Sequence, residues 1–189
     1  MDFAFDDTQT QIRDSIQKIC ANYSDEYWLQ KDREGGFPGD FANDIADAGW
    51  LGIAVPEEHG GAGLGVSEAA VMMMAIAESG AGFAGASSVH MNIFGLNPVV
   101  VHGTGKQKQE WLPPIIAGQH RACFGVTEPD AGLDTANIKT RAELQGEVYL
   151  VNGAKIWTST AQTANKILLL ARTAPIESTP NPIDGLTLF

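Results

Sequence analysis

Two short stretches of the sequence carry side chains that could bind a flat heteroaromatic ligand. The first, CFGVTEPDAGLDTANIKTRA at residues 123–142, places a polar, turn-rich bend between two apolar runs. The second, VNGAKIWTSTA at residues 151–161, sets Trp157 beside the hydroxyls of Thr158 and Ser159. An indole offers a surface to a flat ring, and hydroxyls offer hydrogen bonds to its edge. Two alternatives stay open: a core tryptophan on a strand, and a plain surface loop.

Other candidate motifs lack the context that their chemistry requires. GAGFAG at residues 80–85 matches G-x-G-x-x-G, but a helix precedes it and no acidic residue follows at the required spacing. It therefore predicts a loop between two helices. The four histidines have no metal-ligand spacing, and no G-x-S-x-G elbow occurs. Cys20 and Cys123 are predicted to be small buried hydrophobes in a reducing compartment.

Composition narrows the class of protein. The chain has 189 residues, of which 44% are hydrophobic and 19% charged, which is typical of a globular protein. The formal net charge of -11 argues against nucleic-acid binding, which needs a basic face. The N-terminus is acidic and no apolar run approaches the roughly 18 residues of a membrane span. We therefore expect a cytoplasmic protein with no membrane span and no signal peptide.

Apolar periodicity predicts that the first two thirds of the chain are helical. The predicted helices are a stripe at residues 12–23, a shorter one at 41–48, an apolar helix capped by Ser67, an apolar segment at 89–101 and a polar helix from Thr104 to Pro113-Pro114.

From about residue 121 the pattern changes to short strands. The predicted strands cover residues 121–127, 138–144, 147–151, 155–159, 166–172 and 185–189. Gln145-Gly146 and Asn152-Gly153 are typical of hairpin turns, the second more strongly. This order predicts an α+β protein: an all-helical domain at residues 1–120, then an antiparallel β-barrel-like domain at residues 121–189. The last strand ends without a polar tail, so we expect the β domain to be incomplete at the C-terminus.

Together, the two opening stretches resemble the acyl-CoA dehydrogenase family. FGVTEPDAGLD and, about 30 residues later, NGAKIWTS are similar to two family signatures. GWLGIAVPEEHGGAGLG (49–65) and GTGKQKQEWLPPIIAGQ (103–119) resemble two more, in the family's order. The resemblance covers the whole chain. It implies an FAD-dependent oxidoreductase of fatty acid β-oxidation that removes hydrogens from the α and β carbons of an acyl-CoA thioester.

The resemblance implies roles for individual residues. Val126 and Thr127 would meet the pyrimidine edge of the flavin, Trp157 would pack against its ring, and Ser159 would bond near N5. The implied cofactor-binding residues are Phe124, Val126, Thr127, Leu133, Asp134, Trp157, Thr158 and Ser159. The implied substrate-binding residues are Leu133, His90, Met91 and Phe94.

Two of these positions leave alternatives open, and the catalytic base lies elsewhere. The family pattern has serine where this chain has Leu133, whose backbone N–H, but not its side chain, can donate a hydrogen bond. His90 lies in an apolar segment and could equally be a satisfied core histidine. In the family the base is a glutamate of a C-terminal helical bundle, which we expect to begin well after Phe189. Glu128 is expected to shape the bend, so no catalytic residue is assigned.

The resemblance also implies partners. These are the acyl-CoA substrate, an electron-transfer flavoprotein or similar acceptor, and further copies of the chain in a dimer or tetramer. The alternative is a truncated, non-catalytic homologue that acts as an interaction or binding module. Bound flavin would support the enzyme, and a soluble, flavin-free oligomer would support the module.

Overall fold

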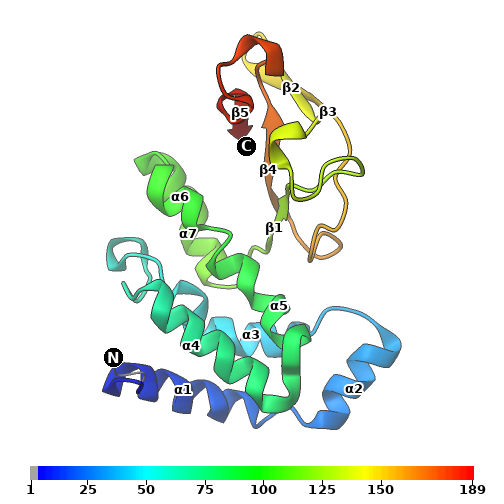
Figure 1. Ribbon diagram of the computed structural model, residues 1–189. Helices are drawn as coiled ribbons and strands as arrows, with labels where there is room; N and C mark the ends of the chain where they lie inside the picture. The colour runs from blue at the N-terminus through cyan, green and yellow to red at the C-terminus, as the bar shows by residue number, and fades with distance from the viewer. Residues whose placement is uncertain (1–3) are drawn as a thin grey trace. The chain divides into compact units, whose positions relative to one another are not determined.

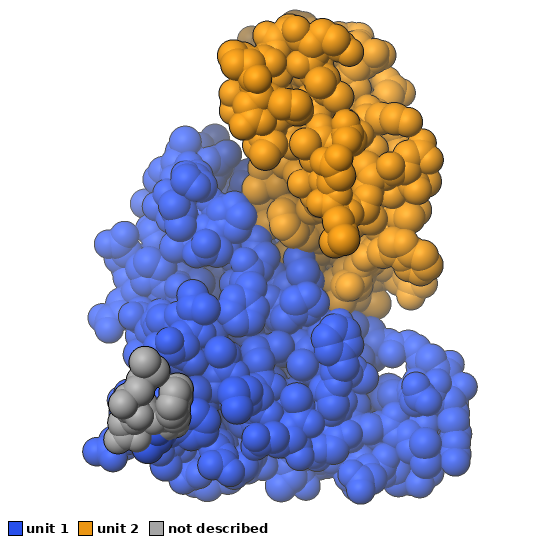
Figure 2. All heavy atoms as spheres, viewed as in Figure 1, with its two compact units in different colours: residues 1–121 blue, residues 122–189 orange. Residues whose placement is uncertain are grey.

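The computed structural model describes residues 4–189 and divides into two compact units, Met1–Arg121 and Ala122–Phe189 (Figure 2). The first unit is all helical (Figure 1). Its helices are α1 (Asp7–Cys20), α2 (Asp25–Glu34), α3 (Gly39–Asp47), α4 (Val66–Ile76), α5 (Gly82–Ile93), α6 (Asn97–His102) and α7 (Gly105–Ile116).

Caps and apolar stripes explain where the helices lie. Asp6 caps α1 by accepting a hydrogen bond from the amide of Gln9 at 2.8 Å, and the Gln9 side chain completes a capping box. Ile12 and Ile16 are buried on the inner face of α1, which packs against α4. The predicted stripe at residues 12–23 is thereby confirmed as far as Cys20, where α1 ends; Tyr23 lies beyond the helix.

Three helix boundaries differ from the prediction. Gly65 rather than Ser67 occupies the cap position of α4, with the Glu68 carboxylate accepting from the Gly65 amide at 3.0 Å. Pro113 and Pro114 lie inside α7, which continues to Ile116. The prolines remove two amide donors, but their carbonyls still accept hydrogen bonds at the end of the helix. The apolar segment 89–101 is divided between α5 and α6.

Residues Val66–His102 form a helical segment that is long and apolar enough to cross a membrane by length and composition alone. Positive φ angles at Gly80 and Gly82 kink it. The predicted loop at 80–85 is wrong, because Gly80 and Ala81 belong to a π-helical turn (Ala77–Ala81) and residues 82–85 to α5. Met72 and Ile76 of α4 are fully buried in the core of the helical unit. These side chains belong to the interior of the unit.

The second unit contains one five-stranded sheet. Its strands are β1 (Ala122–Gly125), β2 (Arg141–Gln145), β3 (Val148–Asn152), β4 (Lys166–Arg172) and β5 (Leu186–Leu188). They lie in the order β1-β4-β2-β3, with β5 also paired to β4. β4 runs parallel to β1 and β2, whereas the β2–β3 and β4–β5 pairs are antiparallel.

The α+β order is confirmed, but the predicted antiparallel barrel-like sheet is wrong because the sheet is mixed. Gln145-Gly146 does form a hairpin turn, joining β2 to β3 with Gly146 at φ 64°. Asn152-Gly153 does not, and no strand forms at residues 155–159. Two irregular connections link the strands instead: residues 126–140 join β1 to β2, and residues 153–165 join β3 to β4. Connections of this length allow β4 to pair in parallel with strands far from it in sequence.

Candidate cofactor site

A buried carboxylate organises the polar bend that follows β1. The Glu128 side chain is only 5% exposed, and its backbone pairs with that of Ala131 to close the bend. Its carboxylate accepts from the backbone amide of Lys139 at 2.6 Å and from that of Thr140 at 2.8 Å. The bend is thereby fixed to the residues that lead into β2.

Lys155 joins the second polar stretch to this bend. Its Nζ, on a side chain that is 9% exposed, donates to Glu128 Oε1 at 2.8 Å and to the Val126 carbonyl at 2.9 Å. The next amide, that of Ile156, donates to the Thr127 carbonyl at 2.9 Å. These hydrogen bonds hold the loop that carries Trp157 beside the bend that carries Val126 and Thr127.

The same contacts keep Glu128 ionised. Burial acts to raise the pKa of Glu128, but hydrogen bonds from Lys155 and from the amides of Lys139 and Thr140 outweigh it and lower the pKa to about 2. A carboxylate held in this way is a poor proton acceptor at neutral pH. Its bonding agrees with the expectation that Glu128 shapes the bend and is not the base.

Trp157 is presented to solvent from a strained backbone. Its side chain is 86% exposed, so the alternative of a core tryptophan is wrong. Its φ angle is 56°, in the left-handed region that large side chains rarely adopt. Such strain costs on the order of 1–3 kcal/mol and clusters at binding and catalytic sites. An exposed indole beside backbone groups of a polar bend suits a flat ring.

The remaining predicted cofactor residues lie in the same unit with different exposure. Phe124 is half-buried on β1, opposite Leu168 of β4. Thr158 is half-buried and Ser159 exposed on the loop after Trp157. Among the exposed residues of the bend, the Asp134 carboxylate accepts a hydrogen bond from the side-chain amide of Asn137.

Leu133 lies in the bend and is fully exposed, at 106% of its reference surface. Within residues 4–189 its side chain is therefore not part of a core. Together with Trp157, it is a large apolar side chain presented by an irregular segment of the second unit.

The predicted substrate residues lie in the helical unit. His90, Met91 and Phe94 are half-buried on or at the end of α5, with His90 and Phe94 four residues apart on one side of the helical path. His90 Nδ1 lies 2.9 Å from the Ser87 carbonyl within the same helix. The histidine is thus oriented by its own helix and is not fully buried.

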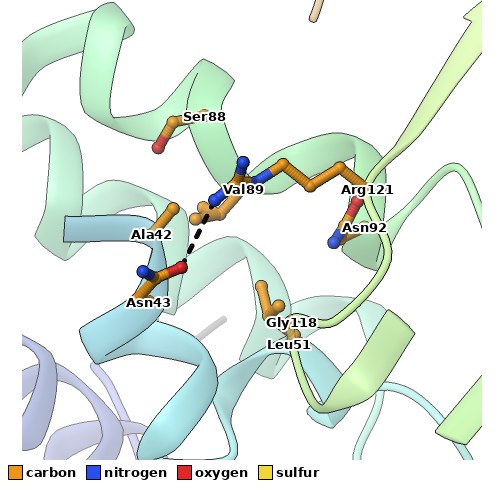
Figure 3. Close-up of a pocket in the computed structure, with 8 residues that line it drawn as sticks. All are labelled: Ala42, Asn43, Leu51, Ser88, Val89, Asn92, Gly118 and Arg121. Atoms are coloured by element: carbon orange, nitrogen blue, oxygen red, sulfur yellow. Dashed lines mark hydrogen bonds between the residues drawn. The ribbon is translucent and has the colours of Figure 1, made fainter. Parts of the chain in front are cut away.

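A small cavity in the helical unit is too narrow for a cofactor (Figure 3). Its volume is about 10 Å³, close to that of one water molecule. Arg121 donates to Asn43 Oδ1 at 3.3 Å beside it, and Asn92 donates to the His120 carbonyl at 3.1 Å. Figure 3 shows its eight lining residues: Ala42, Asn43, Leu51, Ser88, Val89, Asn92, Gly118 and Arg121.

Sequence reasoning missed the role of Lys155. A lysine between Ala154 and Ile156, in a stretch expected to be a strand, was the available signal for a buried ion pair with Glu128.

Among residues 4–189, no group of three or more histidine, cysteine, aspartate or glutamate side chains could hold a metal ion. Cys20 and Cys123 are free and buried, which confirms their predicted burial.

Comparisons with known proteins match nearly the whole chain. The family model for the N-terminal domain of acyl-CoA dehydrogenases matches residues 6–119, and that for the middle domain matches residues 123–189. The mitochondrial isovaleryl-CoA dehydrogenase of Arabidopsis thaliana is 32% identical over 187 residues, which are 98% of this chain and 44% of that protein.

Solved structures give the same result. A chain in the structure of the electron transferring flavoprotein of Acidaminococcus fermentans is 29% identical with a TM-score of 0.86, over 100% of this chain and 48% of that one. The FAD complex of PigA has a TM-score of 0.89 at 24% identity, over 100% of this chain and 49% of that one, and shows the fold alone. This chain spans less than half the length of each of these proteins.

Proposed function

Because this chain belongs to the acyl-CoA dehydrogenase family, we propose that it supplies the flavin site and part of the substrate site of an acyl-CoA dehydrogenase. The resemblance found in four sequence segments is confirmed by both family models. The observation that carries the proposal is the junction of Lys155 with Glu128 and Val126, which holds an exposed Trp157 beside the polar bend.

FAD is the proposed cofactor, because the second unit offers an exposed indole and nearby hydroxyl and backbone groups to a flat ring. In this proposal the Trp157 indole would pack against the isoalloxazine, and the backbone of Val126 and the hydroxyl of Thr127 would hydrogen-bond its pyrimidine edge. Ser159 would hydrogen-bond near N5. Phe124, Leu133, Asp134 and Thr158 complete the proposed cofactor contacts. When bound, FAD supplies the acceptor for the hydride from the β carbon.

The proposed substrate is an acyl-CoA thioester. His90, Met91 and Phe94 of the helical unit would contact its acyl part, and Leu133 its thioester tail. The Arabidopsis relative, named for isovaleryl-CoA, supports this class of substrate. An electron-transferring flavoprotein is the proposed acceptor, and the match to a chain in the Acidaminococcus structure supports that partner. We propose a homo-oligomer, as the family resemblance implies.

A non-catalytic binding module is the second candidate. Among residues 4–189, Glu128 is the one buried carboxylate, and its oxygens already accept from Lys155 and two backbone amides. This favours a chain that binds ligand without abstracting a proton, since α-proton removal needs a carboxylate with a free oxygen.

Flavin content and flavin reduction separate the two candidates. The protein as its gene encodes it, here called the intact protein, should be purified, saturated with FAD and freed of excess cofactor. It should then be mixed anaerobically with a panel of acyl-CoA thioesters that includes isovaleryl-CoA. Bleaching of bound flavin by one of them supports the dehydrogenase. Protein that retains flavin but is not reduced by any supports the module. Protein that retains no FAD contradicts the flavin site itself.

A further inference from the structure

Three segments of the second unit meet at the ion pair between Glu128 and Lys155. They are the bend at residues 126–131, residues 139–140 before β2, and the loop at residues 153–160 after β3. Both side chains are almost completely buried, although each of these segments is irregular and carries exposed residues.

Stability alone is a weak explanation for this pair. Removing two charges from water is costly, and their attraction often does no more than offset that cost, so a well-packed apolar pair is commonly as stable. An apolar pair, however, makes no directed hydrogen bonds that would fix the position of one segment relative to the other. Lys155 Nζ contacts one carboxylate oxygen and one carbonyl at defined distances of 2.8 and 2.9 Å, which fixes the loop relative to the bend.

The residues fixed in this way are those proposed to hold the flavin. Val126 and Thr127 immediately precede Glu128, and Trp157 lies two positions after Lys155. The left-handed backbone of Trp157, at φ 56°, persists only if its surroundings determine it. The Lys155 side chain and the Ile156 amide hold the two residues directly before it.

We propose that Lys155 and Glu128 are positioning residues of the flavin site, a role that rests on the proposed function. They set the spacing between the Trp157 loop and the Val126–Thr127 bend, and so the fit of both to the isoalloxazine ring. Neither touches the reacting atoms.

Lys155→Met in the intact protein tests this role. The variant keeps an unbranched chain of similar reach and removes the three N–H donors. We expect at least tenfold weaker FAD binding, with changed visible circular dichroism and a shifted reduction potential of the flavin that is still bound. These last two readouts report the environment of the ring and would not move if the pair only stabilised the fold.

Lys139→Met is the matched control. It makes the same change of charge on a lysine that pairs with Asp130 of the same bend at 3.1 Å, but both side chains are exposed. The Lys139 amide that donates to Glu128 is retained. We expect FAD affinity within twofold of the wild type and an unchanged flavin spectrum.

A double variant addresses the charge that Lys155→Met leaves buried. Glu128→Gln with Lys155→Met has no buried charge at the junction, so it should fold even where the single variant does not, and it should still bind FAD weakly. Wild-type affinity and spectrum in either folded variant would overturn the proposal, as would loss of folding in both, which would assign the pair to stability. Wild-type protein that binds no FAD would instead overturn the proposed function together with this inference.

Discussion

Glu128 is an acidic residue whose environment, more than its type, decides what it does. Its carboxylate is buried and accepts from a lysine and two backbone amides. A free carboxylate in the same bend would be a candidate base beside a flavin. Here the oxygens are already occupied, so Glu128 holds the bend in place and is not the base of the proposed reaction.

The bonding of Glu128 predicts a loss of stability in acid. Its pKa of about 2 in the folded state lies below the ordinary value of 4.5, so the unfolded state binds the proton more readily. The stabilisation is fully present above pH 4.5 and is lost as the pH falls towards about 2. It amounts to on the order of 3 kcal/mol in the free energy of unfolding.

Urea titrations across this pH window check the prediction. In Glu128→Gln the free energy of unfolding should be lower at neutral pH and should fall less in acid. Asp130→Asn, which removes an exposed carboxylate of the same bend, should keep the wild-type pH dependence. Parallel curves for wild type and Glu128→Gln would refute the assignment.

Leu133 gives a second prediction at this scale. Because its side chain is fully exposed, Leu133→Ser should change the free energy of unfolding by no more than about 0.5 kcal/mol. If the residue lies beside the thioester tail, acyl-CoA affinity should stay equal or improve by up to about 1.5 kcal/mol, the value of one neutral hydrogen bond.

Calorimetry with an acyl-CoA thioester and a thermal melt of each variant measure both quantities. Leu144→Ser, at another exposed leucine of the second unit, is the control and should leave acyl-CoA affinity unchanged. Weaker acyl-CoA binding by Leu133→Ser alone would mean that the leucine packs on the substrate and does not merely replace a serine.

At the scale of elements, the sequence predicted correctly those structures that depend on interactions over only a few residues. The stripe of Ile12 and Ile16 placed α1, and Gln145-Gly146 placed the β2–β3 hairpin, because helical period and turn chemistry act over a few residues. Asn152-Gly153 gave the stronger turn signal of the two, but no hairpin forms there. There, long-range hydrogen bonds from Lys155 and Ile156 to the bend replace the strand that the pattern predicted.

The candidate site, too, was predicted only where the signal is local in the sequence. Trp157 and the bend were found from residue types and a family resemblance, whereas the Glu128–Lys155 contact spans 27 positions and leaves no periodic signal. The mixed sheet was missed for the same reason: the parallel pairing of β4 with β1 depends on two irregular connections, whose paths are fixed by side-chain contacts.

Gly153 tests this explanation at the element scale. A Cβ at this position would lie 2.6 Å from Thr140 Cα and 2.3 Å from Thr140 Oγ1, so the backbone must shift. Gly153→Ala should therefore destabilise the protein by about 1–3 kcal/mol, as overpacking does, and should weaken FAD binding by displacing the loop.

Gly132→Ala is the control, because a Cβ there meets nothing within 4 Å, and it should stay within about 0.5 kcal/mol of the wild type. Denaturant midpoints and FAD titrations measure both effects. A Gly153→Ala variant as stable as Gly132→Ala would contradict the prediction, because it would mean that the close approach of residue 153 to Thr140 does not fix the loop.

At the scale of the whole molecule, the proposed binding residues are shared between two compact units. The cofactor residues lie in the sheet unit, and His90, Met91 and Phe94 lie in the helical unit. The chain spans 44% of the Arabidopsis isovaleryl-CoA dehydrogenase. The proposed binding residues thus all lie within these 189 positions, and none of the described residues is proposed as the proton-abstracting group.

The last prediction follows from this division: residues 1–189 alone should not dehydrogenate any acyl-CoA. Removal of the α proton needs a carboxylate with a free oxygen near the thioester. Among the described residues the one buried carboxylate, Glu128, is held by Lys155 and two amides. The test mixes the 189-residue chain with FAD, an artificial electron acceptor and a panel of acyl-CoA thioesters. The Arabidopsis enzyme with isovaleryl-CoA is the positive control. Turnover by the 189-residue chain would show that a residue within it serves as the base, and turnover that disappears in Glu128→Gln would identify that residue as Glu128.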